Sequence, residues 1–368
     1  MEQRLRDWYA EHGRVLPWRR RRSLYRVWVS EIMLQQTQAA TVGPYFHRFL
    51  RRFPSVKRLA EAPIETVLRA WEGLGYYRRA RQLHQAARQI RAERGGRLPR
   101  TVDDWTALPG VGRYTAHAIL SFALDERLPI LEANTRRLYC RLLGLSGDGR
   151  SAAAERQLWD FAWQLLPPSD IADWNDALID LGATRCLPSR PACDECPWRT
   201  FCLAARHGTQ ADCGRSAMRP AVTEQTEAAL VVTCGDRLFL QQRGGDERWS
   251  GLWDFPRLPA DASPSTTPLS LDSTMHRHID RYLRGFGIRP RQVDYWTTIR
   301  YTITRYRVTL HAVRVEARSL PTRRRSPPAR WFDATALESL PLTRPARRLV
   351  RQMARSPSSL ASPCGAST

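Results

Sequence analysis

The sequence contains a single lysine, Lys57, so every other basic residue is an arginine. It contains no run of 18 or more apolar residues, which excludes a transmembrane helix of ordinary length. The segment from Met1 to Trp8 is polar and charged, unlike the apolar segment of a secretory signal. From these absences we expect a cytoplasmic protein that does not enter a membrane.

Acidic residues are also scarce relative to basic ones, 36 against 58, which gives a net charge of +22. A surplus of this size lies on the surface and attracts polyanions, of which nucleic acid is the first candidate. A generally basic proteome or an anionic membrane surface remains an alternative explanation. With 368 residues, the chain is long enough for two domains.

Four of the eight cysteines lie close together, as Cys186, Cys193, Cys196 and Cys202, in the spacing C-x6-C-x2-C-x5-C. Four thiolates at this spacing can hold a [4Fe–4S] cluster or a zinc ion. Zinc sites usually contain two C-x2-C pairs, and only one is present, so the spacing favours the cluster. Arg190, between the first two cysteines, is placed to reach a phosphate.

Apolar periodicity divides the chain into a helical part and a mixed part. Spacings of three and four residues predict an all-α domain over residues 1–206, which includes the cysteine loop 186–202. Its helices are expected at 23–36, 76–90, 114–124, 134–143, 156–166 and 172–181.

A polar linker is expected at 207–225, followed by a smaller α+β domain at 226–348. β-Branched and aromatic residues predict its strands, and one amphipathic stretch predicts a helix. The strands are expected at 228–233, 237–243, 295–301 and 305–315, and the helix at 273–286. Residues 349–368 are rich in Ser, Ala and Pro and are expected to be a disordered tail.

A glycine-containing turn reads LPGVGRYT over residues 108–115, between a short helix predicted from Thr101 and an apolar helix predicted from Tyr114. Gly110 and Gly112 let the backbone approach a ligand closely. Backbone N–H groups at the start of the following helix favour an anion. The turn therefore predicts a hairpin that grips a phosphate, although an ordinary corner between two helices would look similar.

The hairpin and the cysteine spacing together resemble the endonuclease III branch of the helix–hairpin–helix DNA glycosylases. Within that branch, WVSEIMLQQTQ at 28–38 and WEGLGYY at 71–77 resemble the adenine DNA glycosylases of the MutY type. QQR at 241–243 and SGLWDFP at 250–256 are similar to the Nudix-like domain of that family. Because no Nudix hydrolase box is present, the second domain is expected to recognise rather than to hydrolyse.

The resemblance implies a site with two carboxylates. Glu31, between apolar neighbours, matches the general acid that protonates the departing base, and burial would keep it protonated. Glu132 is implied to stabilise the positively charged sugar, by its charge or by a transient covalent bond. Tyr114 and Asn134 are implied to form hydrogen bonds in this site. Tyr114 replaces the lysine of the strand-cleaving relatives, so a monofunctional enzyme is expected.

The resemblance also implies residues that contact DNA. They form the adenine pocket, fill or wedge the gap in the stack, or contact the partner base. They are Trp18, Arg19, Gln36, Thr37, Leu74, Tyr76, Gly110, Gly112, Asp176 and Arg190.

Three departures from the family pattern leave alternatives open. The family sequence Leu-Asp-Gly-Asn is Leu-Glu-Ala-Asn here, with Glu132 one methylene longer. Asp176 stands where the family has a Glu. Residues 303–305 are Ile-Thr-Arg where the family senses 8-oxoguanine with Phe-Ser-His. A catalytically weakened DNA-binding paralogue and a glycosylase of altered base specificity therefore remain alternatives.

The expected function is hydrolysis of the N-glycosidic bond of adenine mispaired with 8-oxoguanine or guanine, in base excision repair. The expected cofactor is a [4Fe–4S] cluster, and the expected partner is double-stranded DNA containing adenine mispairs. We expect a monomer associated with the bacterial nucleoid.

Overall fold

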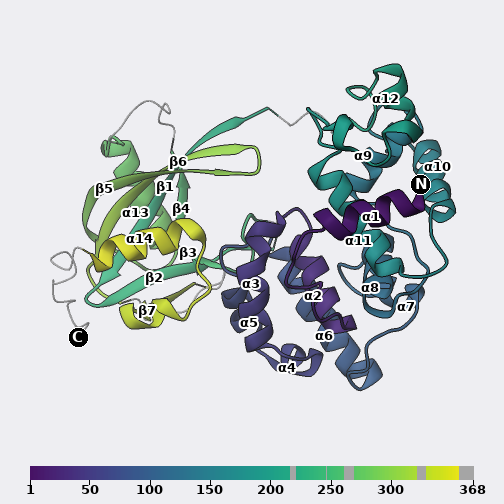
Figure 1. The fold of residues 1–368 in the computed structure, drawn as a ribbon. Helices are drawn as coiled ribbons and strands as arrows, with labels where there is room; N and C mark the ends of the chain where they lie inside the picture. The colour runs from purple at the N-terminus through teal and green to yellow at the C-terminus, as the bar shows by residue number, and fades with distance from the viewer. Residues whose placement is uncertain (216–220, 246, 261–268, 321–328, 356–368) are drawn as a thin grey trace. The chain divides into compact units, whose positions relative to one another are not determined.

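The computed structural model describes residues 1–215, 221–245, 247–260, 269–320 and 329–355, which fall into two compact units (Figure 1). One unit contains the described residues of 1–63 and 79–215, and the other those of 64–78 and 221–355. No helix in these ranges combines the length and the apolar character that crossing a bilayer requires.

The first unit is helical, as its apolar periodicity predicts. Its α-helices are α1 (Glu2–His12), α2 (Leu24–Leu34), α3 (Ala39–Arg52), α4 (Val56–Glu61), α6 (Arg78–Arg94), α7 (Val102–Thr106), α8 (Arg113–Leu124), α9 (Ala133–Leu142), α10 (Ala152–Gln164), α11 (Ile171–Thr184) and α12 (Leu203–His207). Two short 3-10 helices, η1 (Cys193–Glu195) and η2 (Arg199–Phe201), lie in the cysteine loop.

Helices α2, α8 and α11 are buried around most of their circumference and form the centre of this unit. Ser23 begins α2 by accepting a hydrogen bond from the backbone N–H of Arg26, which satisfies one of the free donors of the first turn. Trp28 on α2 packs edge-on against Trp105 on α7. Polar side chains on these central helices therefore lie in a low-dielectric environment.

The second unit contains α5 (Ile64–Trp71) and a mixed sheet in the order β3-β2-β1-β6-β5. Strands β1 and β6 are parallel, and the other pairs are antiparallel, including β4 with β1 and β7 with β2. The strands are β1 (Thr223–Cys234), β2 (Arg237–Gln242), β3 (Trp253–Asp254), β4 (Arg257–Pro259), β5 (Pro290–Ile303), β6 (Tyr306–Ala317) and β7 (Ala329–Asp333).

Alternate residues of β1 pack on opposite faces of the sheet, as the two-residue period of a strand requires. Ala229 and Val231 belong to a core shared with α14 (Arg344–Ala354) and with Leu337 of the 3-10 helix η3 (Ala334–Glu338). Leu230 and Val232 belong to a core shared with α13 (Ser273–Arg284). The sheet is therefore covered by a helix on each face.

Two predicted boundaries differ from the structure. Helix α14 continues to Ala354, so the disordered tail predicted from residue 349 is wrong for 349–354, where Leu349 and Met353 are buried in the core. Within the predicted linker 207–225, Cys213 is buried and pairs with Ser146, so this part packs on the helical unit. The last residues of the chain, 356–368, lie outside the described ranges.

Candidate active site

A cavity of about 750 Å³ in the first unit is lined by α2, the segment 35–39, the segment 14–22 and parts of α8, α9 and α11. Nine of the predicted site residues line it, although they lie far apart in the sequence. They are Trp18, Arg19, Glu31, Gln36, Thr37, Tyr114, Glu132, Asn134 and Asp176.

Glu31 lies near the C-terminal end of α2 and is 6% exposed. Burial raises its pKa to about 7, with smaller contributions from the negative charges of Asp176 and Glu132. The hydroxyl of Tyr114 donates a hydrogen bond to Glu31 Oε2 at 2.9 Å, which opposes this rise. The raised pKa expected from the sequence is thus found in the structure, and the carboxyl group retains a proton at a pH where an exposed glutamate has lost it.

Glu132 is the N-cap of α9. Its Oε1 accepts hydrogen bonds from the backbone N–H groups of Asn134 at 2.8 Å and Thr135 at 2.9 Å, and Thr135 Oγ1 accepts from the backbone N–H of Glu132. Burial raises the pKa of Glu132, and the two backbone donors oppose that effect. The helix N-terminus also favours a negative charge at this position. Glu132 is therefore held in place by the start of the helix that it caps.

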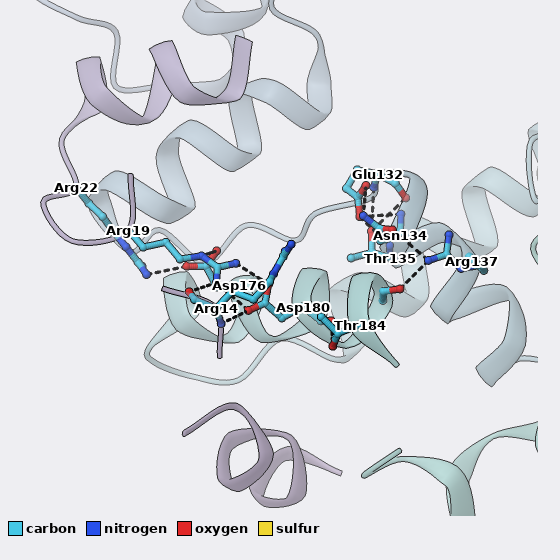
Figure 2. A network of polar contacts seen from close by, with 11 residues as sticks. Arg14, Arg19, Arg22, Glu132, Asn134, Thr135, Arg137, Asp176, Asp180 and Thr184 are labelled. Carbon is cyan, nitrogen blue, oxygen red and sulfur yellow. Dashed lines mark hydrogen bonds and ion pairs between the residues drawn. The ribbon is translucent and has the colours of Figure 1, made fainter. Parts of the chain in front are cut away.

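A series of hydrogen bonds leads from Glu132 through Asn134 to Arg137 (Figure 2), and from Arg137 to Cys186 in the cysteine loop. Asn134 Nδ2 donates to Glu132 Oε2 at 3.3 Å, and Asn134 Oδ1 accepts from Arg137 Nη2 at 3.1 Å. Arg137, which is buried, also donates from Nε to the backbone carbonyl of Cys186 at 2.7 Å. Sequence reasoning missed Arg137, whose position one helical turn after Asn134 was the available signal.

Ion pairs between arginines of the segment 14–22 and buried aspartates of α11 form another part of the cavity wall. Arg19 Nε lies 2.8 Å from Asp176 Oδ1, and Arg22 Nη2 lies 2.8 Å from Asp176 Oδ2 (Figure 2). Burial raises the pKa of Asp176 to about 6, and the two guanidinium groups oppose this. Asp180, fully buried, binds Arg14 and Arg19, and their hydrogen bonds outweigh burial and lower its pKa. Both oxygens of Asp176 are thus engaged by arginine.

The predicted hairpin is present between α7 and α8. Gly110 has φ +80°, and a Cβ there would lie 2.9 Å from Gln82 Cβ, so a side chain is excluded on both grounds. A Cβ on Gly112 would meet no protein atom within 4 Å, so packing within the protein does not require that glycine. Gly112 is the N-cap of α8, whose first backbone N–H groups have no side-chain partner at the cap.

Gln36 has φ 57°, an unusual value for a residue with a side chain. The segment around it is fixed by Arg79, which donates to the carbonyls of Ile32 at 3.0 Å and Met33 at 2.8 Å and to Thr37 Oγ1 at 2.9 Å. Arg79 also donates to the carbonyl of Gln35. This arginine, which the sequence did not single out, holds a segment that lines the cavity.

The other predicted DNA contacts lie elsewhere. Leu74 and Tyr76 belong to the second compact unit, where Leu74 is buried and Tyr76 is 46% exposed. Arg190 is exposed in the cysteine loop of the first unit. The turn at residues 303–305 joins β5 to β6, and Thr304 there has φ 51°.

The four clustered cysteines line one small, mainly apolar pocket together with Leu138 and Leu142. Arg141 Nη1 donates to Cys186 Sγ at 3.3 Å. Burial raises the pKa of Cys196 to about 11. Among the described residues, no three side chains are grouped closely enough to hold one metal ion.

Comparisons with known proteins agree on both units. Residues 29–163 match the HhH-GPD superfamily of base excision DNA repair proteins, and residues 228–352 match the NUDIX domain. An adenine DNA glycosylase of Rattus norvegicus is 40% identical over 71% of this chain. That of Buchnera aphidicola (subspecies Schizaphis graminum) is 34% identical over 68% of this chain and 72% of its own length. The chain spans about half the length of the mammalian relatives it matches, 51% of the rat protein.

A solved structure of a thermostable thymine-DNA glycosylase resembles the chain with a TM-score of 0.52 and 28% identity. The similarity covers 56% of this chain and 94% of that structure.

Proposed function

Because this chain belongs to the adenine DNA glycosylases, we propose that it hydrolyses the N-glycosidic bond of adenine in double-stranded DNA. The proposed substrate is adenine opposite 8-oxoguanine or guanine, and the product is an abasic site without a strand break. The observation that carries the proposal is the pair of carboxylates, Glu31 and Glu132, in one cavity beside Tyr114. We place this activity in the cytoplasm, on the DNA of the nucleoid.

Glu31 acts as the proton donor. Anionic adenine is a poor leaving group, so a proton must reach the base as the bond to the sugar breaks. With its pKa at about 7, Glu31 keeps a proton near neutral pH and can release it to a base nitrogen. Tyr114, whose hydroxyl already donates to Glu31, then stabilises the carboxylate that remains.

Glu132 acts on the sugar. As the bond breaks, positive charge develops on the sugar, and a fixed carboxylate nearby stabilises it. The backbone donors of Asn134 and Thr135 keep that carboxylate oriented and favour its charged form. The longer side chain of Glu132 folds back on the helix terminus, so the extra methylene is accommodated by the cap. The distance from the Glu132 carboxylate to the sugar decides the rate of base release, because a displacement of about 1 Å lowers such a rate on the order of a hundredfold.

No lysine is available to attack the sugar in this cavity, because Tyr114 occupies the position implied for the lysine of strand-cleaving relatives. The residues of the cavity fit hydrolysis by water, without a covalent intermediate between an amine and the sugar. The enzyme is therefore proposed to be monofunctional.

The four clustered cysteines are proposed to hold a [4Fe–4S] cluster. Four thiol donors, the ligand number of a [4Fe–4S] cluster, border one apolar pocket. When bound, the cluster would cross-link the loop and turn the cysteines into thiolates. The cationic Arg141 beside Cys186 Sγ suits the negative charge of such a site.

The remaining contacts are assigned to DNA. Gly110 and Gly112 at the start of α8, with the exposed Arg190, are proposed to bind phosphates. Gln36, Thr37, Leu74 and Tyr76 are proposed to hold the distorted duplex, as the family resemblance implies. The enzyme is proposed to act as a monomer on this duplex.

Altered base specificity is a second candidate, and the state of Asp176 favours it. Arg19 and Arg22 each bind one of its oxygens, so only the second lone pair of each oxygen remains for the amino group of adenine. The acceptor atoms of a purine would then face the N–H donors of the arginines, and its ring would contact the indole of Trp18.

Base release from duplexes with adenine opposite 8-oxoguanine, under single-turnover conditions, tests the proposal. Glu31→Gln should abolish release, and Glu132→Asp should retain it, because the charge remains. Hydrolysis of another base while every adenine mispair stays intact would support the second candidate instead. Tight binding without any base release would support a non-catalytic binding protein.

A further inference from the structure

The first unit carries a strongly one-sided charge distribution outside its catalytic cavity. Residues 13–60 contain eleven arginine or lysine side chains and a single acidic one, the buried Glu31. Arg14, Arg19 and Arg22 are neutralised by aspartates of α11. The other eight cations form no ion pair with a carboxylate in the described part of the chain, so their charge faces solvent.

Three of these eight cations line a second pocket, of about 340 Å³, beside the segment 14–22. Arg20, Arg21, Arg26 and His47 line it with Val15 and Pro17, and no carboxylate does. Arg26 is held in place, since its Nε donates to the carbonyl of Arg21 at 2.8 Å and its guanidinium lies over the ring of Phe46. An anion entering the pocket would meet the guanidinium of Arg26, which is already fixed, and two exposed arginines beside it.

Further arginines lie on α3, the helix that carries His47 of that pocket. Arg26 also lines a neighbouring pocket of about 320 Å³ that leads to Ser55, at the start of α4. The exposed Arg48 and Arg51 follow on α3. We call the set of Arg20, Arg21, Arg26, Arg48 and Arg51 the α3 basic surface.

The second pocket and the catalytic cavity are lined by different residues. Along the segment 14–22, Leu16, Trp18 and Arg19 line the cavity. Pro17, Arg20 and Arg21 line the second pocket, and no residue lines both. A nucleotide in the cavity would therefore contact other side chains than an anion in the second pocket does.

We propose that the α3 basic surface binds the phosphate backbone of a second segment of duplex DNA while the first segment occupies the catalytic side. The proposal rests on one part of the proposed function, namely that a first segment of DNA binds at the catalytic cavity. Holding two segments allows the protein to pass from one to the other without dissociating into solution, which shortens the search for a rare mispair.

Duplex DNA fits this surface better than a protein partner does. The cores of protein interfaces are apolar and depleted of charge, whereas DNA-binding surfaces are polar and strongly positive. Between residues 13 and 60, Val15 is the one large hydrophobic side chain that is strongly exposed in the described structure. Arginine side chains in a shallow, acid-free depression match phosphates repeated along a backbone.

Competitor-dependent dissociation tests the proposal without any base release. The full-length, cluster-loaded protein is bound to a fluorescent duplex of normal base pairs and is then mixed with increasing concentrations of unlabelled duplex. If the competitor binds the α3 basic surface before the labelled duplex leaves, the protein passes directly from one duplex to the other. This direct transfer makes the observed dissociation rate rise linearly with competitor concentration. The variant R20Q/R21Q/R48Q should lower that slope by about tenfold, because three phosphate contacts are lost, while the rate extrapolated to zero competitor stays close to that of the unmodified protein.

A matched control removes the same charge elsewhere in the same unit. The variant R88Q/R97Q/R100Q changes three exposed arginines of α6 and the segment after it, and it should keep the full slope. Equal thermal melting of both variants and the unmodified protein confirms that the fold is intact. A rate independent of competitor in the unmodified protein, or an equal slope in both variants, would overturn the proposal.

A further arm uses polyglutamate as competitor. If it accelerates release as well as duplex does, and only when Arg20, Arg21 and Arg48 are present, the surface binds acidic polypeptides and the proposal is refuted. Direct transfer in a protein that releases no adenine would leave this inference intact and refute the proposed function.

Discussion

Replacing Glu31 by Gln should stabilise the protein above neutral pH while removing its activity. Burial raises the pKa of Glu31 from 4.5 to about 7, so the folded state binds a proton more tightly than the unfolded state does. The buried carboxyl group costs nothing well below pH 4.5, and it destabilises the fold progressively as the pH rises from there through 7. This rise of the pKa from 4.5 to about 7 corresponds to about 3 kcal/mol, of which about 2 kcal/mol develops between about pH 5.5 and about pH 8.

The neutral amide introduced by Glu31→Gln avoids this cost, and its oxygen can still accept the hydrogen bond from Tyr114. Urea unfolding of the cluster-loaded protein at about pH 5.5 and about pH 8 measures the effect. We expect Glu31→Gln to gain about 2 kcal/mol relative to the unmodified protein between these conditions. The exposed Glu93→Gln is the control and should gain nothing. A Glu31→Gln variant with the same pH dependence as the unmodified protein would refute the reasoning.

Four further outcomes are expected. Glu132→Gln should slow single-turnover base release by about a hundredfold or more but leave duplex affinity nearly unchanged in a gel-shift assay; an equal loss of both would contradict its assignment. Arg137→Met leaves two backbone carbonyls and an amide oxygen without their donor, and it should lower the free energy of unfolding by about 2–4 kcal/mol in urea titration. Cys196→Ser should lose the visible absorbance of the cluster and weaken folding or DNA binding, and unchanged binding would count against the cluster assignment. The logarithm of DNA affinity should fall steeply and linearly with the logarithm of salt concentration, and a flat response would contradict phosphate binding.

The sequence predicted the elements that have a strong period. Apolar spacing located α2, α8, α9 and α11, because these helices bury long apolar faces. Strands β3 and β4 have two and three residues, which is too short for alternation to show. Helix α14 was missed in part, because its arginines and the Ser- and Pro-rich segment after it obscured the four-residue spacing of Leu349 and Met353.

The cavity residues were anticipated through family motifs, but the contacts that hold them were not. Glu31, Tyr114 and Glu132 line one cavity as expected. The pairing of Arg14 with Asp180 joins residues 166 positions apart, and no local pattern reveals such a contact. Arg79 resembled any other arginine of an Arg-rich helix until its carbonyl partners were visible. Side chains that support a site through long-range contacts thus need the folded structure to be recognised.

The pH dependence of single-turnover adenine release tests the central claim most directly. With adenine opposite 8-oxoguanine as substrate, the rate should fall about tenfold per pH unit above a midpoint near 7, where Glu31 loses its proton. A rate that is flat through this range, or that falls only below about pH 5, would contradict the assignment of Glu31 as the proton donor.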